Sequence, residues 1–76
     1  MSFVDSLTQH IPWSSKTFGI GRRTLRITKH IRKELAEIES TPDDLNEWID
    51  VIILAADGAW RCGYTPQDIE LAFERK

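Results

Sequence analysis

The sequence is poor in the features that anchor a chain in a membrane or stabilise it outside the cell. Cys62 is the single cysteine, so no disulfide can form within the chain. The longest apolar run, from Val51 to Ala56, is far too short to span a bilayer. No N-terminal run has the charged, apolar and small-residue order of a signal peptide. We therefore expect a cytoplasmic protein with no membrane partner.

The chain also has too few residues for a large core. Its 76 residues predict a single domain over positions 1–76, in which about 60–65% of the unfolded surface becomes buried. Domains of this size usually gain stability from disulfides, a metal or association with another subunit. Because a disulfide is excluded, we expect a bound metal, a homodimer or tetramer, or both.

Several sequence patterns are absent, and each absence removes a class of protein. The sequence has no Gly-rich Walker loop, no Ser-His-Asp set and no zinc-ligand spacing. No segment alternates between apolar and polar residues with period two, so strands are not expected. The apolar periodicity instead predicts an all-α fold of four helices. We place them over residues 3–10, 22–39, 42–62 and 66–76, with a loop over 12–21 between the first two.

Three Ser/Thr-x-x-acid patterns predict where helices begin. They start at Ser2, Thr41 and Thr65, and each fits a capping box in which the hydroxyl and the acid bind free backbone N–H groups. Pro42 suits the first position of a helix, and Gly63 is a typical stop. Only two residues then separate the second and third helices, which predicts a tight antiparallel hairpin.

Charge is strongly segregated beneath a net charge of −2. Residues 6–33 contain seven bases and no acid, whereas residues 34–60 contain eight acids and no base. Both blocks follow helical periodicity, which favours folded faces over disordered tails. A basic face beside an acidic one suits a cation with phosphates. The two faces could equally pair with each other.

Two pairs of acids lie at the closed end of the expected hairpin. Glu34 and Glu37 lie about 60° apart around one helix, and Glu47, Asp50 and Asp57 fall within about 80° on the next. The rest of the third helix is apolar, which is typical of a buried central helix. Carboxylates next to a core need compensation.

Two kinds of partner could compensate these acids. One is an arginine, for which Arg22, Arg23, Arg26 and Arg61 are available. The other is a divalent cation held by carboxylates from two facing helices. An all-oxygen ligand set favours Mg²⁺ or Mn²⁺ over zinc, and Mg²⁺ usually also takes phosphate oxygens. A site of this kind predicts a phosphorylated substrate.

The two acid pairs, Glu-x-x-Glu and Glu-x-x-Asp, resemble those of the MazG-like all-α nucleoside triphosphate pyrophosphohydrolases. Much longer segments are similar to the small phage and prophage dATP/dGTP pyrophosphohydrolase-type domain. These segments are TFGIGRRT (17–24), HIRKELAEIE (30–39), DLNEWIDVIILAADGAWRCGY (44–64) and the TPQDI that follows. The resemblance covers roughly residues 13–76.

The resemblance implies a Mg²⁺-dependent enzyme, with Mn²⁺ as a substitute, that converts a purine dNTP to its monophosphate and pyrophosphate. It implies Glu34, Glu37, Glu47 and Asp50 as metal ligands, and Glu34 or Glu37 as the group that orients or deprotonates the attacking water. A phage origin would place the reaction in the host cytoplasm. Such domains continue past position 76 with a polar and aromatic segment, so a chain ending at Lys76 leaves open a trimmed sequence, a short member or a relative without turnover.

Other residues have two interpretations each. Asp57 is a further ligand or a group that orients one, and His30 is either a base near Glu34 or an ordinary helix residue paired with that acid. Trp13, Phe18, Trp60 and Tyr64 either stack a purine or seal a thin core. The full set of expected substrate-binding residues is Trp13, Arg22, Arg23, Lys33, Trp60 and Lys76.

Two other functions compete with the enzyme. A non-catalytic phage module of the same fold would bind a nucleotide or a host protein. A nucleic-acid-binding protein would use residues 16–33 as its basic face, although the overall acidity of the chain argues against it.

Overall fold

The fold was obtained as a computed structural model that describes residues 2–76. Four helices make up most of the chain, and the described residues contain no strand, which confirms the all-α prediction. They are α1 (Phe3–Phe18), α2 (Thr24–Ser40), α3 (Leu45–Trp60) and α4 (Pro66–Glu74). None of these helices combines the length and hydropathy that a membrane span requires.

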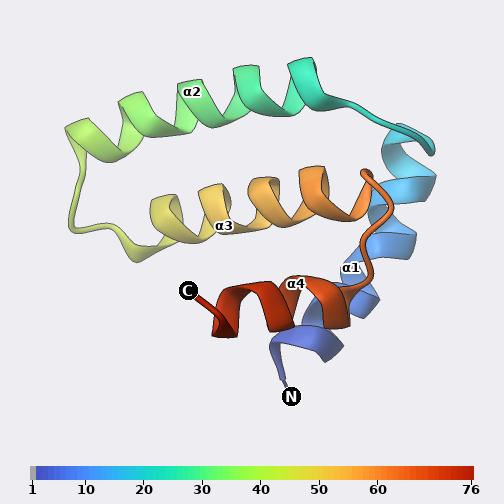
Figure 1. The fold of residues 1–76 in the computed structure, drawn as a ribbon. Helices are drawn as coiled ribbons and strands as arrows, with labels where there is room; N and C mark the ends of the chain where they lie inside the picture. The colour runs from blue at the N-terminus through green and yellow to red at the C-terminus, as the bar shows by residue number, and fades with distance from the viewer. Residues whose placement is uncertain (1) are drawn as a thin grey trace.

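The helices pack around α3 (Figure 1). Figure 1 shows α2 and α3 side by side and antiparallel, with α4 on the opposite side of α3 and α1 near the end where α3 finishes. The contact between α2 and α3 is the most extensive in the molecule. The predicted hairpin is therefore confirmed.

The first helix is longer than the sequence predicts. The expected stop before Pro12 and the loop over 12–21 are wrong, because α1 continues through Pro12 to Phe18. Proline removes one backbone hydrogen bond from a helix. Leu7 before the proline and Ser14 after it are both buried, so packing holds the two halves in one helix. The expected capping box at Ser2 is confirmed, with its hydroxyl accepting from the Asp5 N–H at 3.1 Å.

The connection between α2 and α3 is also longer than expected. The predicted start of α3 at Pro42 is wrong, because Asp44 caps the helix by accepting from the N–H of Asn46 at 3.0 Å. The Thr41 hydroxyl instead donates to the carbonyl of Glu37, which closes the end of α2. Four residues rather than two form the turn. The Thr65 capping box at the start of α4 is confirmed.

The core is thin and leaves one side of α3 open. Among residues 2–76, only four apolar side chains are buried, and they are Leu7, Ile27, Ile38 and Ala56. The prediction of a buried central helix is wrong for the single chain, because an outer face of α3 is exposed. That face consists of Leu45, Trp48, Ile49, Ile52 and Ile53. The other three helices of this short chain cover only part of the circumference of α3.

Candidate metal centre and its cleft

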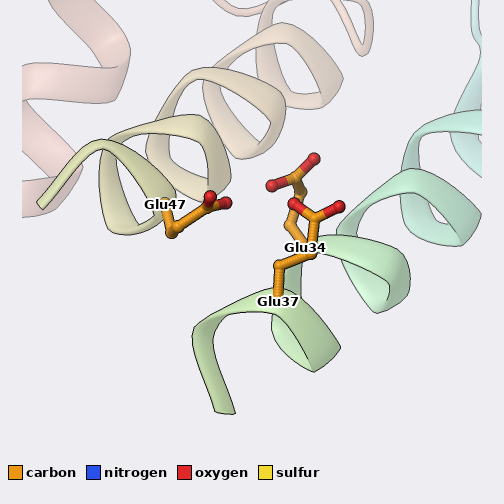
Figure 2. Close-up of side chains that lie close together, drawn as sticks. All are labelled: Glu34, Glu37 and Glu47. Atoms are coloured by element: carbon orange, nitrogen blue, oxygen red, sulfur yellow. The ribbon is translucent and has the colours of Figure 1, made fainter. Parts of the chain in front are cut away.

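Three glutamates converge at the closed end of the hairpin (Figure 2). One carboxylate oxygen from each of Glu34, Glu37 and Glu47 lies within 4.8 Å of the others. Figure 2 shows the first two rising from α2 toward Glu47 in the first turn of α3. The spacing of three residues places Glu34 and Glu37 on one face of α2. The antiparallel turn then brings that face to the start of α3.

These carboxylates lack the partners that buried oxygens require. Glu34 is only 7% exposed, and its Oε1 lies 3.3 Å from His30 Nε2. The Oε2 atoms of Glu34 and Glu47 are buried, and neither has a hydrogen-bond partner within residues 2–76. No lysine or arginine of the described chain forms an ion pair with the three glutamates. A buried oxygen left in this way costs roughly 1–3 kcal/mol or more. An all-carboxylate set of this kind would suit a hard cation as the missing partner.

The clustering changes the acidity of Glu47. Loss of water around its carboxyl group, together with the neighbouring carboxyls of Glu37 and Glu34, raises the pKa of Glu47 from 4.5 to about 7. The neighbouring carboxyls contribute in two ways. A protonated Glu47 can donate a hydrogen bond to them, and an ionised Glu47 is repelled by their charge. Without a cation, the cluster therefore resists full ionisation near neutral pH.

Asp50, the fourth expected ligand, lies beside this group but outside it. It is exposed, and it is not one of the three acids whose oxygens converge. It lines the same cleft as Glu34, one turn of α3 after Glu47. Its carboxylate therefore borders the cleft and does not reach the point where the three glutamates meet.

Asp57 belongs to a separate part of the acidic stripe. Its Oδ2 accepts from Arg61 Nε at 2.9 Å, and its Oδ1 accepts from the Ser14 hydroxyl at 2.6 Å. Trp60 Nε1 also donates to Oδ1, at 2.8 Å. Burial opposes ionisation, but these hydrogen bonds and the Arg61 charge hold the pKa of Asp57 below its usual 3.8. Both oxygens are thus already occupied, so Asp57 is tied to Arg61 and not to the three glutamates.

A cleft of about 400 Å³ runs beside the acids between α1, α2 and α3. One wall carries aromatic rings: His10 lies 5.2 Å from Trp13, and Trp13 contacts Phe18 edge to face at 5.8 Å. The Arg23 guanidinium lies 4.3 Å above the Phe18 ring. The lining residues that carry polar or aromatic groups are His10, Trp13, Ser14, Phe18, Arg23, Arg26, His30, Glu34, Asp50 and Asp57. The cleft thus combines aromatic rings, positively charged arginine side chains and carboxylates.

The expected substrate-binding residues divide into two groups. Trp13 and Arg23 line the cleft. The other four do not: Arg22 reaches the Cys62 sulfur at 3.7 Å, Trp60 bonds to Asp57, Lys33 is exposed on α2, and Lys76 is exposed beyond α4.

Three lining residues with polar side chains, His10, Ser14 and Arg26, were missing from the expected site residues. His10 and Arg26 share helix faces with Trp13 and Arg23 at a spacing of three residues, which is a signal the sequence does carry. Ser14 offers no such signal, because its partner Asp57 lies 43 positions away.

A family model describes nearly the whole chain. The model of the dATP/dGTP pyrophosphohydrolase family matches residues 6–76. The chain belongs to this family. The match includes α1 from Ser6 onward, all of α2, α3 and α4, the three converging glutamates and the residues that line the cleft. No curated protein and no solved structure matches the chain. The family name implies a nucleotide substrate, and the all-helical fold is consistent with the MazG-like superfamily.

Proposed function

We propose that this member of the dATP/dGTP pyrophosphohydrolase family hydrolyses purine deoxynucleoside triphosphates to the monophosphate and pyrophosphate with Mg²⁺. One observation carries the proposal: three glutamates converge, and two of their buried oxygens have no partner within residues 2–76. An all-carboxylate set suits a hard cation such as Mg²⁺, with Mn²⁺ as a substitute. Glu34, Glu37 and Glu47 would hold it, with Asp50 beside them.

Each residue of the centre would have a defined task. The cation, when bound, neutralises phosphate charge and increases the acidity of water. Glu34 is held by His30, so its orientation is set before substrate arrives. Glu37 is less buried than Glu34, and no lysine, arginine or histidine within residues 2–76 forms an ion pair with its carboxylate, which suits it to accept a proton from water. Water then adds to one phosphorus as the α–β phosphoanhydride bond breaks, giving the two products.

The cleft supplies the remaining contacts with the nucleotide. The rings of His10, Trp13 and Phe18 line one wall, where the face of a single ring could stack on the base; such stacking is worth about 1–3 kcal/mol per base. Arg26 lies on α2 about two turns before Glu34 and would meet the phosphate charge. We therefore place the purine against the aromatic wall and the triphosphate along α2.

The proposal is tested by measuring pyrophosphate release from all dNTPs and NTPs with Mg²⁺, with Mn²⁺ and with EDTA. We expect release from dATP and dGTP that EDTA abolishes. Removing a metal ligand from a centre of this kind typically costs at least 10²-fold, so Glu47→Gln should lose that much kcat. Asp50→Asn should also lower turnover, whereas Glu39→Gln, on the exposed side of α2, should retain it. A folded protein that releases pyrophosphate from no nucleotide would refute the enzyme proposal.

A non-catalytic nucleotide-binding module is the second candidate. The position of Asp50 outside the three-glutamate group favours it, because the fourth acid is not in place around a single point. Binding of dATP or dGTP by calorimetry, with no pyrophosphate released, would support the module.

We also propose that the chain works as a homodimer or tetramer. The support is the exposed apolar face of α3, where Trp48 is 49% exposed and Ile52 is 51% exposed. Exposed apolar patches of this kind mark interaction surfaces.

A further inference from the structure

Arg61 forms a buried network in which every donor of its guanidinium is used. Nε donates to Asp57 at 2.9 Å, and Nη1 donates to the carbonyls of Gly19 and Gly21 at 2.8 and 3.0 Å. Nη2 donates to the carbonyl and hydroxyl of Ser14 at 3.3 and 2.9 Å. The side chain is only 1% exposed. A planar fork with five donors is the feature of arginine that no other side chain reproduces.

The network joins three segments that are far apart in the sequence. Arg61 and Asp57 lie at the end of α3, Ser14 lies in the second half of α1, and Gly19 and Gly21 lie in the loop between α1 and α2. Both glycines have positive φ, at 86° and 92°, so the loop has an intrinsically permissive backbone. Within residues 2–76, the side-chain hydrogen bonds to backbone carbonyls of this loop come from Arg61 alone. The buried Arg61 side chain therefore holds the backbone of the loop between α1 and α2 in place.

The loop determines where part of the cleft wall lies. Phe18 directly precedes Gly19, and Arg23 follows Gly21 by two residues. Both line the cleft and contact each other. Arg61 itself is not a lining residue. Thr24, which follows Arg23 and begins α2, is ten positions before Glu34, or about 15 Å at 1.5 Å per residue. The loop thus positions the end of the cleft that lies away from the glutamates.

We propose that Arg61 is a positioning residue for the nucleoside end of the cleft. By holding the Gly19 and Gly21 carbonyls, it keeps Phe18 and Arg23 where the bound nucleotide meets them. The inference rests on the proposed function, since it assigns the nucleoside to this end. Its signature is weaker nucleotide binding with the chemistry of the glutamate centre preserved.

Arg61→Lys is the most informative variant. Lysine keeps a positive charge beside Asp57, but it cannot reach Ser14 and both loop carbonyls together. We expect KM for dATP and dGTP to rise about tenfold, kcat to change less than about twofold, and the Mg²⁺ concentration for half-activation to stay unchanged. Arg32→Lys, on the exposed side of α2, is the matched control and should change none of these values.

Gly21→Ala provides a second route to the same result. An added Cβ at Gly21 meets nothing within 4 Å, so any effect comes from the strained φ of 92° in the loop. We expect the same rise in KM, because the strain displaces the Gly21 carbonyl that Arg61 binds while the side chains of Arg61, Asp57 and Ser14 are unchanged. This variant keeps the proposal testable if Arg61→Lys does not fold.

Hydrogen exchange separates this proposal from the proposed function. The Gly19 amide donates to the Ser15 carbonyl at 2.9 Å, and we expect it to exchange at least about tenfold faster in Arg61→Lys than in the Arg32→Lys control. Unchanged exchange, or a loss in kcat with KM unaltered, would overturn the positioning role. If the wild type binds nucleotides without turnover, the same comparison is made with Kd. If it binds none, the proposed function fails and this inference fails with it, even where the loop exchange changes.

Discussion

At the scale of single residues, the acidic stripe of α3 is compensated in two different ways. Asp57 has an arginine partner, and its pKa is lowered. Glu47 has two carboxylates as neighbours, and its pKa is raised. The sequence left an arginine and a cation as alternative partners for the whole stripe. In the structure, Arg61 pairs with Asp57 near the C-terminal end of α3. At the other end of the stripe, Glu47 Oε2 is buried and has no hydrogen-bond partner within residues 2–76.

The raised pKa of Glu47 predicts how stability depends on pH. The folded state binds this proton more tightly than the unfolded chain, so without a cation stability falls as pH rises from about 4.5 to about 7. Asp57 acts in the opposite sense. Its pKa is lowered in the folded state, so its contribution to stability is lost only as the pH falls below 3.8, the usual pKa of an aspartate. The two pH windows do not overlap. We expect the metal-free Tm to decrease between about pH 5 and about pH 8.

Magnesium should reverse this trend. Because the cation binds the ionised carboxylates, added Mg²⁺ should raise Tm more at about pH 8 than at about pH 5. Glu47→Gln should remove most of the pH dependence and most of the Mg²⁺ response. Thermal unfolding followed by circular dichroism measures both. A Mg²⁺ response equal at the two pH values would contradict a site that includes Glu47.

At the scale of the helices, caps and buried anchors set the boundaries together. The Thr-x-x-acid pattern correctly marks α4 at Thr65 but misplaces α3, where Asp44 rather than Thr41 is the cap. Thr41 has a competing acceptor in the Glu37 carbonyl, which exists only once α2 has formed. Pro12 likewise does not end α1, because Ser14 is anchored by Asp57 and Arg61.

The Asp44 cap gives a prediction for the start of α3. Asp44→Ala should lower the free energy of unfolding by about 1 kcal/mol, because an N–H of the first turn loses its acceptor. Asp43→Ala, one position before the cap, should change it by less than about 0.5 kcal/mol. Urea unfolding of the two variants without metal makes the comparison. Equal losses would show that Asp44 does not act as the cap.

At the scale of the whole molecule, the exposed face of α3 predicts self-association. Light scattering coupled to gel filtration should give a dimer or tetramer for the wild type. Ile49→Gln together with Ile52→Gln should shift it toward the monomer, because both side chains lie on the exposed face and glutamine suits a helix. Leu25→Gln, an exposed apolar position on α2, is the control. A monomeric wild type at micromolar concentration would contradict the assembly proposal.

The sequence by itself determined the helical class, the antiparallel hairpin and the likeness to the family. These follow from local signals: periodicity, caps, and acids spaced three residues apart on neighbouring helices. The tertiary structure alone decided which acids converge and which pair with arginine. It separated Asp57 from the glutamates through Ser14 and Arg61, and it left Asp50 outside their group. The convergence depends on how α2 packs against α3, and the burial of the Asp57–Arg61 pair depends on Ser14, 43 positions before Asp57, which no local pattern in the chain encodes.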